Sequence, residues 1–371
     1  MSIRVLLAGG GTSGHVHPAL AIADRIRAVD PESVIEFCGT SRGIESDLVP
    51  KAGYTFHVIR ARGIPSRPSR KLFLALADMA AGRRACLRRI RDFRPDIVIG
   101  TGGYVCTPLV SAAHAMRIPV LLHEQNAFPG RSNRMMSRNA AVVCTGFPDT
   151  ESFFSHAGKV VYTGNPVKDI FFQMNRAQAR RDLGLADDVF LVLAMGGSLG
   201  ARTINDAVSA LADAKLPENT KIVLSAGRQQ HAELIGKHPS TSGKLEILEY
   251  IYNPEVYMAA CDLMICRAGA ITCAEIAALG IPSIMIPYPF AAGDHQTSNA
   301  ASFANQNASV MMKDNQVTAA SLADVVATLY ADRSRLSAMG EAARRLACPD
   351  AAADIVREVM QVCENRRKPK T

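Results

Sequence analysis

Several features that would point to common classes of protein are missing from this sequence of 371 residues. It has no tryptophan, and its nine cysteines include no Cys-x-x-Cys pair, so neither a zinc site nor a disulfide framework is indicated. No Asp-x-Asp motif occurs, and no group of His, Asp and Glu residues has metal-ligand spacing. No apolar run approaches the roughly 20 residues that span a bilayer, and the first residues predict a strand rather than a signal peptide. We therefore expect reduced thiols, no bound metal and a cytoplasmic location.

The composition is that of a globular protein, with 48% hydrophobic and 20% charged residues and enough length for two domains. The net charge of +8 is placed unevenly: residues 1–165 hold 21 basic and 12 acidic side chains, whereas residues 166–371 hold 21 and 22. Residues 60–94 alone hold 11 basic and 2 acidic side chains. Such a patch suits nucleic acid, anionic lipid or an acidic substrate. The scarcity of aromatic residues and of binding motifs argues against nucleic acid.

Short runs rich in β-branched residues alternate with helical patterns along the chain, which predicts an α/β fold with doubly wound parallel sheets. The pattern pauses after residue 163 and restarts with a strand, a glycine turn and a helix, as at the beginning. We expect two Rossmann-like domains facing a cleft, formed by residues 1–163 and 164–349. A last helix over about 350–365 is expected to pack back on the first domain.

Two glycine-rich turns follow predicted strands at corresponding places, in GGGTSGH (residues 9–15) and MGGSLGA (residues 195–201). Such turns let a diphosphate approach the amides at a helix start, although an ordinary strand-to-helix turn explains them as well. Ser198 could add a hydroxyl to a phosphate. A dinucleotide site would need an acid at the end of the second strand, and Glu36 lies inside that strand instead. The turn in GTGGYV (residues 100–105) has two interpretations that the sequence supports equally, an anion site and an ordinary turn.

His15 lies at the start of the helix that follows the first glycine turn. A neutral histidine there could remove a proton from an acceptor hydroxyl, because a helix amino terminus disfavours the imidazolium ion. The alternative is a structural hydrogen bond, and His17 is a competing candidate two residues away.

The stretch from Leu263 to Gln296 predicts a strand, a tight turn, a helix over Ala270–Leu279 ended by Gly280, and a second strand. The first amides of this helix form a phosphate site, and Glu275, one turn further on, could accept hydrogen bonds from sugar hydroxyls. This stretch therefore predicts a pocket for a nucleotide sugar.

Residues 71–93 predict an amphipathic helix with a buried stripe at positions 72, 76, 79, 86, 90 and 93 and arginines at 83, 84, 88, 89 and 91. The basic face is either merely solvated or a contact with anionic lipid.

Seven motifs occur in order over most of the chain, namely GGGTSGHVHPA, GTGGYV, HEQN, TGNPV, MGGSLGAR, CRAGAITCAEI and DHQ. In this order they resemble the MurG-type N-acetylglucosaminyltransferases of bacterial wall synthesis. The resemblance implies a GT-B fold, UDP-GlcNAc bound by the second domain, and undecaprenyl-pyrophosphoryl-MurNAc-pentapeptide bound by the first. It also implies inversion at the anomeric carbon without a cofactor or an obligatory metal. The enzyme would lie on the cytoplasmic face of the cell membrane as a peripheral protein.

The resemblance also assigns roles to individual positions. Glu275 would hold the uridine ribose, the backbone at Ile251 the uracil edge, and His15 would act as the base on the muramoyl C4 hydroxyl. Ser13, Lys168 and Thr297 differ from the residues common in the family. The implied substrate-binding residues are Thr12, Ser13, Gly14, Asn126, Lys168, Ser198, Ile251, Ala270, Ile271, Thr272, Cys273, Ala274, Glu275 and Gln296. The acceptor diphosphate is expected at Gly10, Gly11, Gly102, Gly103 and Tyr104.

Two other functions remain open at this point. A UDP-GlcNAc 2-epimerase would share the fold and the donor and would convert the donor without an acceptor. A nucleotide-binding adaptor at the membrane would bind UDP-GlcNAc and release no UDP.

Overall fold

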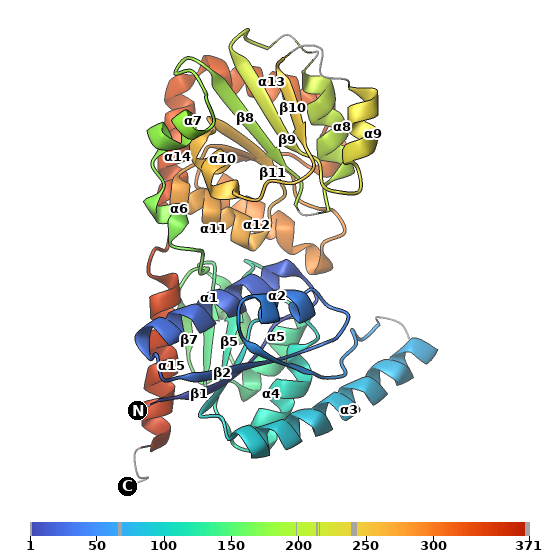
Figure 1. Cartoon of the computed structure of the whole chain (residues 1–371), viewed down its shortest axis with the longest axis vertical. Helices are drawn as coiled ribbons and strands as arrows, with labels where there is room; N and C mark the ends of the chain where they lie inside the picture. Colours follow the sequence, from blue (N-terminus) through green and yellow to red (C-terminus); the bar gives the residue numbers. More distant parts are fainter. Residues whose placement is uncertain are drawn as a thin grey trace. The chain divides into compact units, whose positions relative to one another are not determined.

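The computed structural model describes residues 2–65, 69–197, 199–212, 214, 216–238 and 243–367. The chain divides into two compact units. Unit 1 comprises Met1–Val167 and Asp350–Thr371, and unit 2 comprises Lys168–Pro349. Each unit is an α/β body built on its own parallel sheet (Figure 1).

Unit 1 contains a parallel sheet of seven strands in the order β3-β2-β1-β4-β5-β6-β7. Its strands are β1 Arg4–Ala8, β2 Val34–Gly39, β3 Thr55–Val58, β4 Ile97–Gly100, β5 Val120–Glu124, β6 Val142–Thr145 and β7 Val160–Tyr162. Its helices are α1 Ser13–Val29, α2 Glu45–Lys51, α3 Arg70–Phe93, α4 Cys106–Ala115, α5 Arg131–Met136 and α15 Ala351–Arg367, with short turns η1 Ser137–Asn139 and η2 Thr150–Phe154. The strand order reverses direction at β1 and β4, where ligands of such sheets usually bind.

Most residues in the strands of unit 1 are apolar because helices cover both faces of the sheet. Leu7 of β1 belongs to a core shared with Ile22 of α1, whereas the neighbouring Leu6 belongs to the opposite core, with Leu109 of α4. The helix α15 adds Ile355 and other apolar residues to the core on the α1 side. The end of the chain is thus part of unit 1.

Unit 2 contains a parallel sheet of six strands in the order β10-β9-β8-β11-β12-β13. Its strands are β8 Phe190–Met195, β9 Thr220–Ser225, β10 Leu245–Leu248, β11 Leu263–Cys266, β12 Ser283–Met285 and β13 Ser309–Met311. Its helices are α6 Ile170–Gln173, α7 Arg176–Asp182, α8 Arg202–Leu211, α9 His231–Lys237, α10 Pro254–Ala260, α11 Ala270–Leu279, α12 His295–Ala304, α13 Ala319–Ala331 and α14 Arg333–Arg345, with short turns η3 Ala292–Asp294 and η4 Asp314–Gln316. The prediction of doubly wound parallel sheets is confirmed in both units.

The helix predicted over residues 71–93 is α3, but the predicted buried stripe is wrong at Leu76. Leu76 is 51% exposed, and Phe73 and Leu74 are 74% and 53% exposed. Ala75 is buried in this first part of the helix, and the larger buried side chains, Cys86 and Ile90, come later. The reason is that α4 and the sheet cover only part of α3, whose amino-terminal end projects from unit 1 in Figure 1. Within the described ranges, no helix combines the length and the hydropathy needed to cross a bilayer.

Candidate active site

The first two glycine turns of unit 1 pack directly against each other, because they follow the neighbouring strands β1 and β4. A Cβ atom added at Gly103 would lie 2.2 Å from the carbonyl oxygen of Gly10, and one added at Gly102 would lie 2.8 Å from His15 Nδ1. Gly102 and Gly103 also have φ angles of 110° and 79°, which residues with side chains rarely adopt. The Tyr104 ring lies against Gly11. The structure therefore brings the five positions expected to bind the acceptor diphosphate together with His15.

The backbone amide of one of these positions, Gly11, already has a hydrogen-bond acceptor within the chain. It donates to Glu45 Oε2 at 3.0 Å, and Glu45 Oε1 accepts from the amide and the hydroxyl of Thr40 at 3.1 and 2.7 Å. The Glu45 side chain is buried against Gly10 and Gly43, where an added Cβ would collide with it. In this structure the glycine turn thus encloses a carboxylate of the chain. The amides of Ser13 and Gly14, in the first turn of α1, have no acceptor within the helix and remain suited to an anion.

His15 belongs to a chain of hydrogen bonds along the carboxyl edge of the sheet. Its Nδ1 lies 2.9 Å from Oε1 of the buried Gln125, whose Nε2 lies 2.9 Å from both the Nδ1 and the carbonyl oxygen of His123. His123 Nε2 lies 3.2 Å from the carbonyl oxygen of Gly164. Burial lowers the pKa of His123 to about 4, so this ring is neutral at physiological pH.

Glu124 organises the loop that carries Asn126, a role that the sequence did not indicate. Its Oε1 accepts from the backbone and side-chain amides of Asn126 at 3.0 and 3.1 Å. Its Oε2 accepts from the Gly130 amide and from Asn133 Nδ2, both at 3.0 Å. Because one buried carboxylate fixes four donors, Asn126 is held at the end of β5 in a defined conformation.

In unit 2 the helix α11 spans Ala270–Leu279 and ends at Gly280, which has a φ angle of 66°, as predicted from the sequence. The amides of Ala270, Ile271 and Thr272 lie in its first turn. Cys273 and Ala274 follow, and the Cys273 amide donates to the carbonyl oxygen of Gly269 at 2.9 Å. Glu275 follows on this helix. Burial raises its pKa to about 8, an effect that the positive charge of Lys168 partly offsets. The first amides of α11, which are the predicted phosphate site, therefore lie near Glu275, the predicted ribose acceptor, and near Lys168.

The turn between β11 and α11 is fixed by residues that sequence reasoning had left without a role. Arg267 donates to the carbonyl oxygens of Ile286 and Pro287, both at 3.1 Å, and to Asp314 Oδ1 at 2.6 Å. The buried Asn299 donates to the carbonyl oxygen of Ala268 at 3.0 Å. A cation directly after a strand and before a helix start was the signal in the sequence that could have identified Arg267.

The remaining predicted donor residues lie at the carboxyl ends of strands of the same sheet. Ile251 is buried and follows β10. Gln296 lies in α12, and its Oε1 accepts a hydrogen bond from the backbone amide of Tyr288 at 2.9 Å. The glycine turn after β8 approaches the next strand so closely that a Cβ at Gly200 would lie 2.0 Å from the carbonyl oxygen of Ala226. Ser198, the predicted phosphate ligand in this turn, lies outside the described residues.

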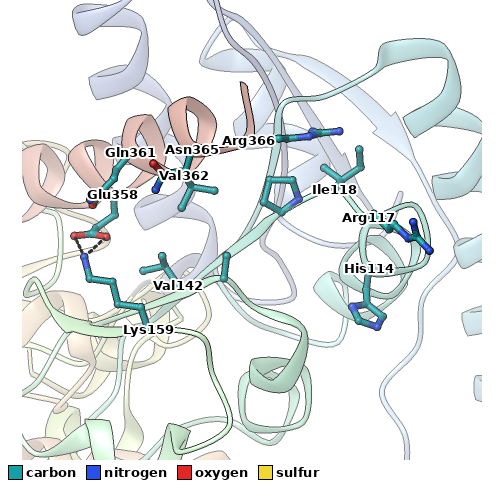
Figure 2. A pocket seen from close by; sticks show the side chains of 12 residues that line it. His114, Arg117, Ile118, Val142, Lys159, Glu358, Gln361, Val362, Asn365 and Arg366 are labelled. Carbon is teal, nitrogen blue, oxygen red and sulfur yellow. Dashed lines mark hydrogen bonds and ion pairs between the residues drawn. The ribbon is translucent and has the colours of Figure 1, made fainter. Parts of the chain in front are cut away.

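A cavity of about 760 Å³ in unit 1 lies away from all of these residues, beside the amino ends of β5, β6 and β7 and against α15 (Figure 2). Lys159 Nζ donates to both carboxylate oxygens of Glu358 at 2.7 Å across one side of it. Arg366 donates to the carbonyl oxygens of Pro95 and Asp96 at 3.1 and 2.8 Å. These cations already bind acceptors of the chain, and we assign the cavity no ligand.

Comparison with known proteins identifies the family. Residues 5–145 match the glycosyltransferase family 28 N-terminal domain, and residues 191–355 match the glycosyltransferase family 28 C-terminal domain. The chain belongs to glycosyltransferase family 28. A family member from Desulforudis audaxviator, named UDP-N-acetylglucosamine--N-acetylmuramyl-(pentapeptide) pyrophosphoryl-undecaprenol N-acetylglucosamine transferase, is 40% identical over 368 residues. The match covers 96% of this chain and 98% of that relative.

Solved structures give the same family and fold. The crystal structure of Acinetobacter baumannii MurG is 31% identical, has a TM-score of 0.80, and covers 97% of this chain and 99% of its own. The UDP-GlcNAc 2-epimerase from Neisseria meningitidis has a TM-score of 0.69 at 16% identity, covering 97% of this chain and 100% of its own, which shows a shared fold alone. The predictions of a GT-B fold and of a MurG-type N-acetylglucosaminyltransferase are therefore confirmed.

Proposed function

We propose that this family 28 enzyme transfers N-acetylglucosamine from UDP-N-acetylglucosamine to N-acetylmuramyl-(pentapeptide) pyrophosphoryl-undecaprenol. The observation that carries the proposal is the 40% identity, over nearly the whole chain, to a relative named for this reaction. The epimerase alternative has weaker support, since the epimerase likeness lies at 16% identity.

Unit 2 is proposed to bind the donor nucleotide. The first amides of α11 and the glycine turn after β8 would receive the diphosphate, since helix amino termini favour anions. Glu275 would accept from the ribose hydroxyls, and the backbone at Ile251 would contact the uracil. Lys168 would add a cation near the diphosphate, although without the two-pronged geometry of an arginine.

Unit 1 is proposed to bind the acceptor and to supply the base. His15 would take the proton from the muramoyl C4 hydroxyl as that oxygen attacks the anomeric carbon and UDP leaves, which inverts the configuration at that carbon. The turn at Gly10 and Gly11 and the turn from Gly102 to Tyr104 are proposed to receive the acceptor diphosphate. Thr12, Ser13 and Gly14, at the start of α1, are proposed to contact the sugar nucleotide, since helix amino termini favour anions. The diphosphate charge that grows on the leaving group would be met by preformed amides, which need no reorganisation during the reaction.

The direct test is transfer of labelled N-acetylglucosamine from UDP-N-acetylglucosamine to a lipid-linked muramoyl pentapeptide. We expect labelled lipid product and UDP in equal amounts, and neither product without the acceptor. Conversion of the donor without acceptor would instead indicate an epimerase. Binding of the donor with no UDP release in the presence of acceptor would indicate an adaptor.

We also propose that the exposed side of α3 contacts an anionic membrane surface. Three exposed apolar side chains, Phe73, Leu74 and Leu76, lie on the same helix as the exposed Arg84 and Arg88. Apolar residues beside cations are the composition of helices that lie in a membrane interface. Not every arginine of α3 is available for lipid, because Arg83 donates to Ser111 Oγ at 3.1 Å and Arg89 is paired with Glu36.

The variant Arg84→Glu/Arg88→Glu is therefore expected to bind phosphatidylglycerol vesicles at least about tenfold more weakly, because each basic residue near anionic lipid contributes about 1 kcal/mol. Co-sedimentation with vesicles measures this, and phosphatidylcholine vesicles provide the uncharged reference. A matched control, Arg25→Glu/Arg345→Glu, makes the same charge change at exposed positions of α1 and α14 and should bind nearly as wild type. Equal losses in the two variants would mean that net charge, and not this helix, governs binding.

A further inference from the structure

We propose that Gln125 is a positioning residue that sets the protonation of the His15 ring, holding the proton on Nδ1 and leaving the lone pair on Nε2. The inference rests on the proposed role of His15 as the base. It follows from hydrogen-bond donors and acceptors whose roles are fixed by their chemistry.

The orientation of the Gln125 carboxamide is fixed by a backbone group. Gln125 Nε2 lies 2.9 Å from the carbonyl oxygen of His123, which can only accept a hydrogen bond. The amino end of the carboxamide must therefore face His123. Its oxygen, Oε1, then faces His15.

The buried His123 ring agrees with this orientation. Its Nδ1 lies 2.9 Å from the same Gln125 amino group and accepts from it, while its Nε2 donates to the carbonyl oxygen of Gly164 at 3.2 Å. These two partners require a neutral ring with the proton on Nε2. The pKa of His123, lowered to about 4 by burial, agrees with a neutral ring.

The protonation of His15 follows from the last link. Gln125 Oε1 can only accept, so the His15 Nδ1 that lies 2.9 Å from it must carry the proton. A neutral His15 ring then has its lone pair on Nε2, away from Gln125, where it can take a proton from a substrate. In the other tautomer two lone pairs would face each other at Nδ1, and Nε2 could not act as a base.

The surroundings hold both side chains in place. Gln125 is 1% exposed, and its backbone carbonyl oxygen accepts a hydrogen bond from Asn165 Nδ2 at 2.9 Å. The His15 ring lies against Gly102, where even a Cβ atom would come within 2.8 Å of Nδ1. The ring therefore has little freedom to turn away from Gln125.

Nuclear magnetic resonance of the full chain labelled with ¹⁵N-histidine tests the inference without any substrate. In wild-type protein we expect a protonated Nδ1 and an unprotonated Nε2 for His15, and the reverse for His123. The signals that disappear in His15→Ala identify the ring. A proton on Nε2 of His15 in the wild-type protein would overturn the inference.

The variant Gln125→Met, which keeps the length of the side chain but offers no acceptor oxygen, tests the role of Gln125 in the reaction. We expect His15 to lose its preference for a protonated Nδ1, and kcat to fall about ten- to a hundredfold with little change in KM for UDP-GlcNAc. Gln125→Glu keeps an acceptor facing His15 and should retain the tautomer. Ser137→Ala removes a partly buried hydrogen bond of 2.9 Å to the Arg134 carbonyl oxygen elsewhere in unit 1 and should change neither measurement.

The outcomes separate the inference from the function on which it rests. An unchanged tautomer or an unchanged kcat in Gln125→Met would overturn the role of Gln125, while a large loss of transfer in His15→Ala would leave the proposed base in place. Full turnover in His15→Ala would overturn the base itself, whatever the tautomer.

Discussion

His15→Ala is expected to lower kcat for transfer of N-acetylglucosamine about 10²- to 10⁴-fold while UDP-GlcNAc still binds with nearly wild-type affinity. The proposed base acts only in the transition state, so its removal raises the barrier without weakening the ground-state complex. Most of the proposed donor-binding residues belong to unit 2, whereas His15 belongs to unit 1. Steady-state rates with the lipid-linked acceptor and calorimetry with UDP-GlcNAc measure the two quantities separately.

The matched control is His17→Ala, which removes a second histidine from the same helix. His17 lies on the exposed side of α1, two residues from His15, and its replacement should leave kcat within a factor of about three of wild type. Equal losses of turnover and of donor affinity in His15→Ala would make His15 a binding residue and leave the base unassigned.

Local patterns in the sequence predicted the elements of this fold well because each pattern reports on its own surroundings. The helix α11 was bounded correctly because Gly280 adopts the left-handed conformation that ends helices. Most strands of unit 1 were recognisable as apolar runs because helices cover both faces of its sheet. By contrast, the period of α3 could not reveal that its first turns leave Leu76 exposed, since periodicity describes one helix and not its neighbours.

The sequence predicted which turns and helix starts form the candidate site, but it did not predict the hydrogen bonds that join them. Glycine turns and the helix starts after them can be read from sequence, whereas the link from His15 to Gln125 joins residues 110 positions apart. That link exists because β4 pairs with both β1 and β5, which places the ends of β1 and β5 close together. The hydrogen bond from Gly11 to Glu45 has the same origin, because α2 follows β2 and β2 pairs with β1. No local motif carries this information.

Glu275 is expected to couple donor binding to the release of a proton. Burial raises its pKa to about 8 in the free protein, so near neutral pH the carboxyl group is mostly protonated. A carboxyl that accepts one ribose hydroxyl at each of its two oxygens is ionised in the complex. Binding of UDP-GlcNAc therefore costs the removal of that proton at neutral pH. Its affinity should rise as the pH approaches about 8 and level off above that value, with a slope of at most about tenfold per pH unit.

Calorimetry in two buffers with different ionisation enthalpies measures this proton directly. At neutral pH we expect close to one proton released per UDP-GlcNAc bound to the wild-type protein and none for Glu275→Gln, whose affinity should be weaker and independent of pH. UDP-GlcNAc is the appropriate ligand because its terminal phosphate is esterified to the sugar and so lacks the ionisation near pH 6 that UDP has. A wild-type affinity that does not change with pH would contradict an ionised Glu275 on the ribose.

The same raised pKa predicts that Glu275→Gln, which should weaken UDP-GlcNAc binding, stabilises the folded protein. Consider an acidic group whose pKa in the folded protein exceeds its value of about 4.3 in the unfolded chain. Its ionisation does not change the free energy of unfolding below about pH 4.3, and it lowers that free energy as the pH rises toward the pKa of the folded state. The folded value here is about 8, so at pH 8 Glu275→Gln should increase the free energy of unfolding by about 2–4 kcal/mol, with no gain near pH 4. Denaturant unfolding of both proteins at these two pH values measures the difference. If Glu275 serves donor binding at the expense of stability, Glu275→Gln should both weaken UDP-GlcNAc binding and increase the free energy of unfolding. A gain in stability without a loss of affinity would remove Glu275 from the donor site.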